Sequence, residues 1–492
     1  MIGDLVLFAT ISPGFLGVVV YFAWKRGRRM AEWTFVVASL LPVLLILSIM
    51  SPVFEAYERG ENPLVFAYPW VTPVGIEFGF LIDMVSYPVC LVIAIVSALS
   101  CIYSTKYMEK DSNLAGYYAS LLLLITGMIG VVLSANLFQF YFFWELMLVP
   151  SYILIAQWGT TRGRLRVGFK YFIFTHAGAL FMLLGILFIF SYAGTASLAD
   201  VHSRLGDVPP NVIGTTCLLL MIGFLVKMAA FPLHAWLPDS YTAAPIPVAA
   251  MLSGAVASCG AYGMARLVVP ILAQWAGQAA DYLMVLGIVT MVYGGLITFS
   301  QSNVKRALAY SSISQAGYVL FGFGTLSTLG IMGSLLHIVN QAVCKSLLFL
   351  SAGLIIGGTN TQDVRKMGGL MSKMPITGLA LLISAFSLSG VPPLNGFWSE
   401  WLIFAGGLAS GKIALTFIGV ASAMITPAYF LWFAWRILFG NLREGSKDAK
   451  EQSPTLLFPV VVLASASVIL GIWPGIFLEF IAPAARSLSS LG

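Results

Sequence analysis

Long apolar stretches, separated by short polar or Gly- and Pro-containing breaks, run the whole length of the 492-residue chain. A membrane-spanning helix needs about 20 consecutive apolar residues. No break between the stretches is long enough for a soluble domain. The pattern therefore predicts an all-α integral membrane protein with about 14 transmembrane helices, over residues 3–24, 31–51, 80–104, 114–134, 137–158, 168–192, 212–241, 247–271, 281–300, 307–326, 329–356, 377–406, 413–439 and 456–482.

The composition of the chain supports a membrane setting and narrows the chemistry. Hydrophobic residues account for 59% of the chain and charged residues for 9%, whereas soluble domains carry about 25% charged residues. The five cysteines stand singly and form no CxxC pair, so their spacing indicates no iron–sulfur, zinc or disulfide framework. The chain contains no basic run interleaved with aromatic residues, so its sequence does not predict nucleic-acid binding. Residues 1–24 are apolar and precede a basic cluster, an order that indicates a first span rather than a cleavable signal peptide.

Basic residues fall mainly on one side of the predicted spans. Lys- and Arg-rich loops mark the cytoplasmic side of a membrane protein. If the loop at 25–29 is cytoplasmic, 19 of the 26 Lys and Arg residues lie in cytoplasmic loops. We therefore predict a multi-pass protein of the cell membrane with both termini on the outer side. The five basic residues assigned to the outer side are Arg59, Arg204, Arg266, Lys412 and Arg486.

Two of the predicted spans are interrupted by a similar motif. Span seven contains PLHAW at 232–236, and span twelve contains PLNGF at 393–397. Five spans separate the motifs, so the two segments cross the membrane in opposite directions, as the halves of an inverted repeat do. The alternative is that proline is simply tolerated in membrane helices. The repeat interpretation divides the chain into an N-terminal three-helix region (1–110), two inverted five-helix repeats with one discontinuous helix each (111–272 and 273–440), and a C-terminal span (441–492).

Five ionisable residues are predicted to lie at mid-membrane depth, where each costs about 2.5–3.5 kcal/mol on insertion scales. Such residues are expected to pair, to line water-filled cavities or to carry ions. One polar face is especially clear, because His337, Gln341 and Lys345 recur every four residues along span eleven. The five candidates for ion translocation are Glu145, Lys227, His337, Lys345 and Glu400.

Structural explanations remain open for these residues. Glu145 could be a neutral, hydrogen-bonded carboxylic acid, and Lys227 could extend toward the membrane surface. Glu400 could lie at an interface rather than at the bilayer centre. The polar face of span eleven could hold helices together through side-chain contacts.

Further polar residues lie near the same spans. His234 and Asp239 flank the break of span seven and could cap freed backbone groups. His176 is a lone polar residue in span six. Its role could be either structural, in helix packing, or functional. Asp83, near the start of span three, is interpreted as structural.

Five segments together make the chain similar to a known family. They are FWELMLVPSY at 143–152, KMAAFPLHAWLPD at 227–239, NVKRALAYSS at 303–312, KSLLFL at 345–350 and GVPPLNGF at 390–397. From about residue 80 to 440 the chain resembles the antiporter-like proton-translocating subunits of respiratory complex I, specifically the fourth-subunit type. The same family includes subunits of Mrp-type cation/proton antiporters, membrane-bound hydrogenases and related archaeal and bacterial redox complexes. The resemblance implies discontinuous helices in inverted five-helix units and a lateral chain of charged residues that carries protons.

The resemblance also implies roles for individual residues. Glu145 matches the glutamate of span five and Lys227 the lysine of span seven, while Glu400 matches the acidic residue of span twelve in fourth-type subunits. Lys345 and His337 then lie between the two ends of the path. Glu145 and Lys227 are expected to form a switching pair, in which proximity stabilises both charges and separation drives the lysine to release its proton.

The chain departs from the family pattern in the middle of this path. Ser258 replaces the lysine that relatives usually carry in span eight, and family histidines are replaced by Tyr241, Gln315 and Gln341. Water could bridge the remaining polar groups. The secondary polar path that we predict comprises His176, His234, Asp239, Ser258, Tyr262, Lys305, Gln315 and Gln341.

Three functions remain open for the chain. The first is a subunit that moves protons, or exchanges Na⁺ for protons, in a redox-driven complex of the complex I or membrane-bound hydrogenase type. Such a subunit carries no cofactor and is not catalytic alone; iron–sulfur, flavin or nickel–iron centres are expected in peripheral partners, with further antiporter-like subunits beside it in the membrane. The second is a Mrp-type cation/proton antiporter subunit without redox chemistry. The third is a structural subunit with an impaired relay, which Ser258, Gln315 and Gln341 favour.

Overall fold

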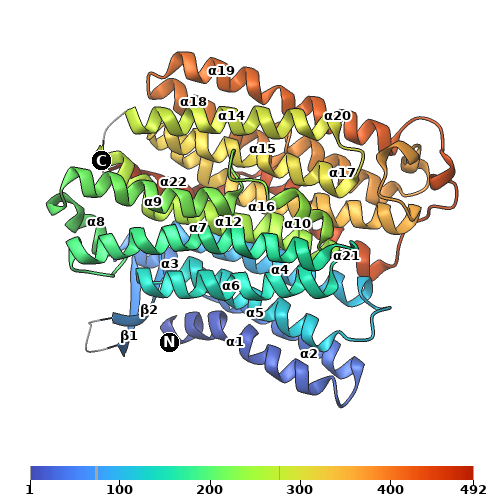
Figure 1. The fold of residues 1–492 in the computed structure, drawn as a ribbon, viewed down its shortest axis with the longest axis horizontal. Helices are drawn as coiled ribbons and strands as arrows, with labels where there is room; N and C mark the ends of the chain where they lie inside the picture. The colour runs from blue at the N-terminus through green and yellow to red at the C-terminus, as the bar shows by residue number, and fades with distance from the viewer. Residues whose placement is uncertain (1, 62, 72–75, 276–277, 491–492) are drawn as a thin grey trace.

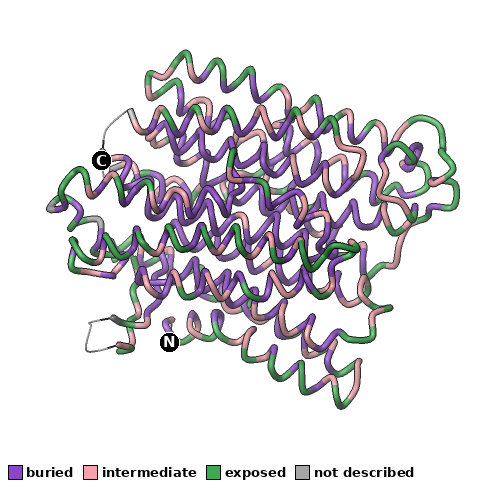
Figure 2. The backbone as a smooth tube through the Cα atoms, viewed as in Figure 1, coloured by how far each residue is buried: buried purple, intermediate pink, exposed green. Residues whose placement is uncertain are grey.

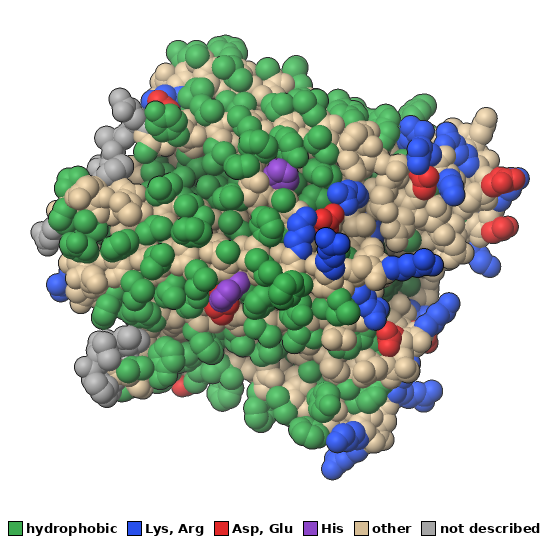
Figure 3. Space-filling model, viewed as in Figure 1, with side chains coloured by type: hydrophobic (Ala, Val, Ile, Leu, Met, Phe, Trp, Pro, Cys, Tyr) green, Lys and Arg blue, Asp and Glu red, His purple; other side chains and the backbone are tan. Residues whose placement is uncertain are grey.

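The computed structural model describes residues 2–61, 63–71, 76–275 and 278–490 of the chain. Its helices lie side by side with their long axes in similar directions, running across the page in Figure 1. Hydrophobic side chains cover the middle of the face seen in Figure 3, and most of its Lys and Arg side chains gather at the right-hand end. Within the described residues, 12 helices are long and apolar enough to cross a membrane. The prediction of a helical, multi-pass membrane protein is confirmed.

The first half of the chain forms α1 (Ile2–Ala23), α2 (Arg28–Ser48), α3 (Met50–Glu58), β1 (Leu64–Val71), β2 (Ile76–Ile82), α4 (Ser86–Tyr107), α5 (Ala115–Leu133), α6 (Leu137–Trp158), α7 (Arg164–Ala193), α8 (Val201–Arg204), η2 (Leu205–Asp207), α9 (Pro210–Met228), α10 (Leu237–Ala243), α11 (Ile246–Met251), η3 (Leu252–Val256), α12 (Ala257–Gly263), η4 (Met264–Val268) and α13 (Val269–Trp275). The second half forms α14 (Gln278–Ser300), α15 (Val304–Gly324), α16 (Thr328–Thr359), η5 (Val364–Lys366), η6 (Leu370–Ser372), α17 (Pro375–Ser387), α18 (Asn395–Ala409), α19 (Ile413–Ala423), α20 (Ile425–Leu438), η7 (Glu444–Ser446), α21 (Pro454–Ile472) and α22 (Gly475–Ser490).

Two of the predicted spans, ten and twelve, are not among the 12 apolar helices. Span ten corresponds to α15, a continuous helix of 21 residues that is rich in polar groups. Its serines and Gln315 are buried against neighbouring helices, which explains how a less apolar helix fits into the bundle. Span twelve is divided between α17, with 13 residues, and α18, with 15. The count of fourteen, the inverted repeat and the four-part division of the chain remain predictions.

The hairpin β1–β2 departs from the expected all-helical chain. The strands pair antiparallel, from Leu64 opposite Ile82 to Val71 opposite Ile76, at one end of the bundle (Figure 1). The prediction that span three begins at residue 80 is therefore wrong. Alternating side chains and a short connection make a hairpin here, and a hydrophobic-length criterion does not distinguish its last strand from a helix.

The C-terminal segment predicted as one span, 456–482, also differs from the structure. It is divided into α21, which ends at Ile472, and α22, which begins at Gly475. Trp473 and Pro474 lie between them. Proline cannot donate the backbone hydrogen bond that would continue α21, so the apolar run does not form a single helix.

Both predicted discontinuous helices are present. α9 ends at Met228, where Ala229 adopts a left-handed φ of 54°, and the chain resumes as α10 only at Leu237. α17 ends at Ser387, Gly390 adopts a φ of 66°, and α18 follows. Left-handed backbone and nearby prolines end each helix because neither continues the i to i−4 hydrogen bonds.

The predicted span eight is continuous but irregular. Two π-helical turns, η3 and η4, join α11, α12 and α13, and Ser258 and Tyr262 lie between them in α12. Such turns are frequent at functional sites. Of the 18 most apolar consecutive residues in Ile246–Ala273, 94% are buried. This agrees with the buried centre of the bundle in Figure 2.

Candidate functional site

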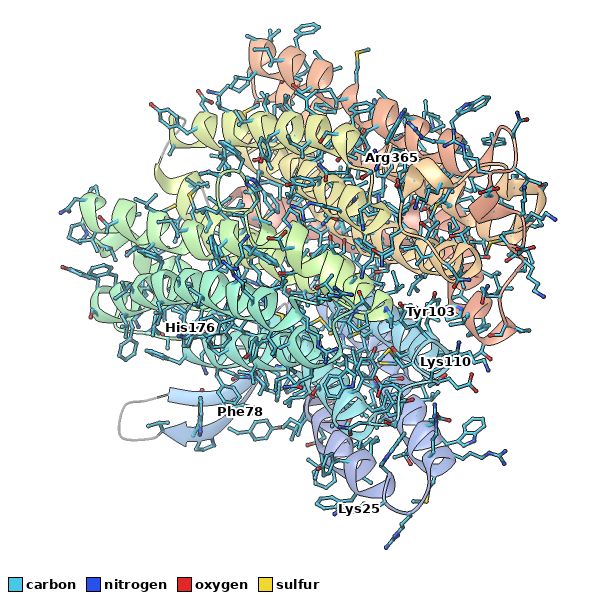
Figure 4. All side chains as sticks on the ribbon, turned by 45° about the vertical axis from the view of Figure 1, so that its right-hand side comes forward. Lys25, Phe78, Tyr103, Lys110, His176 and Arg365 are labelled. Carbon is cyan, nitrogen blue, oxygen red and sulfur yellow. The ribbon has the colours of Figure 1, made fainter. Side chains whose placement is uncertain are left out.

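Glu145 and His176 are in contact on neighbouring helices. Oε2 of Glu145, on α6, lies 3.0 Å from Nδ1 of His176, on α7. Their side chains are 24% and 38% exposed, and His176 lies near the edge of the bundle in Figure 4. Oε1 of Glu145 is buried and has no hydrogen-bond partner among the described residues. One oxygen of this carboxylate is therefore paired and the other is not.

Lys227 lies in an aromatic pocket near the C-terminal end of α9. Its Nζ is 5.6 Å from the ring centre of Trp144 and 5.8 Å from that of Tyr171, and the residue is 2% exposed. Nζ has no hydrogen-bond acceptor among the described residues, and no described carboxylate forms a salt bridge with it within 4.0 Å. The expected ion pair with Glu145 is absent from this arrangement, because that carboxylate contacts His176 instead.

The polar residues predicted to bridge the middle of the path do not bond to one another. Ser258 donates to the carbonyl of Gly254 on its own helix, at 2.6 Å. The hydroxyl of Tyr262 accepts from Nε of Arg266 at 3.1 Å. Oε1 of Gln341 is buried without a described partner. Direct contact does not connect this part of the path.

Lys345 has a defined partner. Its Nζ donates to the hydroxyl of Ser311 on α15 at 2.7 Å and lies 5.4 Å from the ring centre of Phe430 on α20. The residue is fully buried. A neutral hydroxyl and an aromatic face, rather than a carboxylate, thus contact this side-chain nitrogen.

His337 is hydrogen-bonded through both ring nitrogens. Nε2 lies 3.1 Å from Oε1 of Gln315, and Nδ1 lies 3.0 Å from the hydroxyl of Ser399. The amide nitrogen of Gln315 donates to the carbonyl of Leu388 at 3.3 Å, which directs its oxygen toward the imidazole. Because the serine hydroxyl can donate or accept, the network accommodates neutral and protonated imidazole.

Glu400 follows Ser399 on α18 and is partly exposed. Its Oε1 is buried without a described partner. A Cβ atom placed on Gly390 would lie 2.6 Å from Oε2 of Glu400, so the glycine in the break allows the close approach of the chain to this carboxyl group. The structure thus brings Glu400 next to the break and next to the His337 network.

Asp239 belongs to a separate charged cluster beyond the break of α9. It accepts from Nζ of Lys170 and from a guanidinium nitrogen of Arg306, each at 2.8 Å. These contacts join α10 to α7 and α15. The carboxylate has two cationic partners and holds helices together at this end of the molecule.

Two other residues of the predicted secondary path also anchor this region. Lys305 is buried and donates to the carbonyl of Ala244. Nε2 of His234 lies 3.0 Å from the hydroxyl of Tyr293 on α14. Neither residue contacts Glu145 or Lys227 through a described hydrogen bond.

Sequence reasoning missed a buried ion pair between Asp83 and Arg266. Both side chains are 9% exposed, and the two guanidinium nitrogens donate to the two carboxylate oxygens at 2.6 and 2.7 Å. Arg266 is therefore not a loop residue of the outer side, as the count of basic residues assumed. The pairing joins residues 183 positions apart, and no local pattern indicates it.

A second missed cluster surrounds Asn395 at the start of α18. Its amide donates to Oδ1 of Asn340 at 3.0 Å, and Nδ2 of Asn340 donates back to the Asn395 carbonyl at 2.7 Å. The hydroxyl of Ser467 on α21 donates to Oδ1 of Asn395 at 2.8 Å. The asparagine of the PLNGF motif was a signal for this cluster, because it stands where freed backbone groups need partners.

Known proteins resemble this chain over most of its length. A family described as "NADH:quinone oxidoreductase/Mrp antiporter, TM" matches residues 134–426, and one described as "NADH-Ubiquinone oxidoreductase (complex I), chain 5 N-terminus" matches residues 70–118. F(420)H(2) dehydrogenase subunit M of Methanosarcina mazei is 30% identical, over 86% of each chain. A Na(+)/H(+) antiporter subunit of Alkalihalophilus pseudofirmus is 28% identical, over 95% of this chain and 94% of its own.

A solved structure shares the fold. A chain of the membrane-bound sulfane sulfur reductase, an archaeal respiratory membrane complex, superimposes with a TM-score of 0.88. The match covers 99% of this chain and 98% of the other at 24% sequence identity.

Proposed function

This chain belongs to the NADH:quinone oxidoreductase/Mrp antiporter family of membrane subunits, and from that premise we propose that it translocates protons within a multi-subunit, redox-driven membrane complex. The observation that carries the proposal is a series of ionisable side chains inside membrane-depth helices. Each occupies a helix whose other residues are mostly apolar. Groups of this kind mark ion and proton pathways in membrane proteins. They are Glu145 on α6, Lys227 on α9, His337 and Lys345 on α16, and Glu400 on α18.

The second half of the path has the more continuous contacts. They form two groups: Lys345 with Ser311, and His337 with Gln315 and with Ser399, the residue before Glu400. No described hydrogen bond joins the two groups to each other or to Glu400, so the proposed path needs water there too. Hydroxyl and imidazole groups exchange donor and acceptor roles readily. These contacts support a proton path from Lys345 to the carboxyl group of Glu400.

The middle of the path depends on water. Ser258 is bonded within its own helix, and the buried oxygen of Gln341 lacks a described partner. A buried water usually satisfies such an unpaired polar atom. We therefore place water between Lys227 and Lys345, in the position where relatives carry a lysine.

Partner subunits supply the electron transfer in this proposal. The five cysteines are buried and unpaired, and the described residues contain no group of three His, Cys, Asp or Glu side chains that could hold a metal. We assign iron–sulfur, flavin or nickel–iron centres to peripheral partners and place further antiporter-like subunits beside this chain. The uneven distribution of basic residues supports an orientation with both termini outside.

The proposal is tested with Glu145→Gln in the purified native complex, reconstituted in vesicles. Redox-driven proton transport should fall at least about tenfold, because the uncharged amide can neither pair with a cation nor carry a proton. Glu109→Gln is the matched control, since Glu109 lies at the surface in a salt bridge with Lys106. Normal transport by an assembled Glu145→Gln complex would instead support a structural subunit with an impaired relay.

A Mrp-type cation/proton antiporter subunit is the second candidate. The antiporter subunit of Alkalihalophilus pseudofirmus is nearly as similar in identity as the dehydrogenase subunit and is covered more fully. Purification of the chain in mild detergent, followed by identification of the co-purifying subunits, separates the two. An iron–sulfur or flavin protein supports the redox complex, whereas antiporter subunits alone support the second candidate.

A further inference from the structure

Glu145, His176 and Lys227, in the first half of the chain, share a single described polar contact. Glu145 contacts His176 through one oxygen, and its other oxygen is buried without a described partner. Lys227 has no described acceptor. The structure thus contains one anion and two bases, of which the anion reaches only one. A buried charged group without a partner is strongly unfavourable. The proton is therefore expected on whichever base, His176 or Lys227, is paired with the carboxylate of Glu145.

Aromatic contacts place Lys227 against the two helices that carry Glu145 and His176. Nζ of Lys227 lies over the ring of Trp144, the residue directly before Glu145 on α6. It also lies over the ring of Tyr171 on α7, and His176 is on that same helix. The hydroxyl of Tyr171 is held by Ser151 at 2.8 Å, which fixes the aromatic pocket.

We infer that His176 is the second partner of Glu145, and that the carboxylate alternates between His176 and Lys227 as one proton passes between these two bases. The first state of this exchange has the contact seen in the structure: in it we assign the proton to His176, beside ionised Glu145, and leave Lys227 neutral. In the alternative, Glu145 is paired with protonated Lys227, and His176 is neutral. The total charge is zero in both, because one proton moves from the lysine nitrogen to the imidazole or back.

The surroundings of His176 suit this role. The ring stacks on Phe172, with centroids 5.5 Å apart and an interplanar angle of 13°, and this contact holds the imidazole in place in either protonation state. Its side chain is 38% exposed, against 24% for Glu145, so the imidazole is less enclosed than the carboxylate. Tyr141, one turn before Glu145, is the other titratable group in electrostatic contact with the carboxylate.

The exchange of partners does not depend on the proposed function. Only its expected effect on proton transport rests on that proposal. The exchange itself can be measured without any electron donor, by ¹⁵N-histidine NMR of the purified complex in membranes. The chain has four histidines, and His176→Leu identifies the signal of His176. At pH 7 the signal should report a mixture of imidazolium and neutral imidazole.

Two variants give opposite expected results. Lys227→Met removes the competing base, so the neutral fraction of His176 should fall at least about twofold. Glu145→Gln removes the anion, so the imidazolium fraction should fall by a similar factor or more. Lys227→Gln serves as a second variant if the methionine chain does not fold. Lys412→Met, at the distant salt bridge with Asp281, is the control and should leave the signal unchanged.

The outcomes separate the exchange from the transport function. A His176 signal that is the same in the wild type and in both folded Lys227 variants overturns the inference, whatever the transport result. If the exchange is observed, His176→Leu should also lower proton transport at least about tenfold, whereas Leu180→Ala, one turn further along the exposed side of α7, should not. Exchange without any dependence of transport on Glu145 would leave the pairing intact and contradict the proposed function.

Discussion

Two contacts between an acidic and a basic side chain, one deep in this bundle and one nearer its edge, are built differently. Asp83 receives both guanidinium nitrogens of Arg266 and also the backbone amides of Val85 and Ser86, at 3.0 and 2.8 Å. Glu145 receives one contact, from His176, and keeps an unpaired oxygen. The Asp83 pair is both more buried and more fully hydrogen-bonded than the Glu145 pair, and these two differences together separate the pair that we treat as fixed from the one that we propose changes partner.

The fixed pair also has a clear structural position. Asp83 follows β2 and precedes α4, while Arg266 lies in the π-helical turn η4. Arg266 donates in addition to Tyr262. The pair thus attaches the hairpin end of the chain to the irregular helix at the centre of the bundle.

The largest expected effect is on the fixed pair. Arg266→Met should lower the free energy of unfolding by about 3–5 kcal/mol, because it leaves the carboxylate of Asp83 buried without its cation. Thermal unfolding of the complex in detergent measures the loss. Arg59→Met is the control, since Arg59 and Glu55 form a pair that is 60% and 55% exposed, and its effect should stay within about 1 kcal/mol. If Arg266→Met and Arg59→Met lowered the free energy of unfolding equally, the buried pair would contribute no more to stability than the exposed pair.

A double variant sharpens the comparison. Asp83→Leu combined with Arg266→Met removes both charges, so no uncompensated ion remains in the interior. The double variant should recover at least about half of the stability lost by Arg266→Met alone. A double variant that is less stable than the single one would mean that the pair is needed for more than mutual neutralisation.

A smaller loss is expected from Tyr262→Phe. It removes the hydroxyl that accepts from Arg266 but keeps the aromatic ring. The free energy of unfolding should fall by about 0.5–1.5 kcal/mol, which is the usual net contribution of one hydrogen bond. Proton transport should remain at the wild-type level in vesicles, and a large loss would place Tyr262 in the ion path.

The smallest stability effect is expected at the exchangeable pair. His176→Leu should change the free energy of unfolding by at most about 1 kcal/mol, because in the proposed exchange Lys227 then becomes the partner of Glu145 and no buried charge is left alone. The same variant should impair proton transport. His176→Leu should therefore affect transport more than stability, and Arg266→Met should lower stability more than His176→Leu does. A loss of stability as large as that of Arg266→Met would identify the Glu145–His176 contact as structural.

Particular residues show how far the sequence could lead. Glu145, Lys227, Lys345 and Glu400 stood out because each charge interrupts an apolar run, and no partner had to be known to notice this. The breaks after Met228 and Ser387 were also predictable, since proline and glycine act on their own backbone. The partners were less predictable: the contact of Glu145 with His176 was not expected from the sequence, and the switching pair of Glu145 with Lys227 stays a prediction.

The sequence alone determined that this is a multi-pass helical membrane protein, which helices are discontinuous and which buried charges need an explanation. These properties follow from local chemistry, namely the length of apolar runs and the backbone preferences of single residues. Only the tertiary structure decided that residues 64–71 and 76–82 pair as two strands, that Arg266 neutralises Asp83, and that His176 reaches Glu145. Such contacts join helices distant in the chain, and their geometry depends on how all the helices pack together.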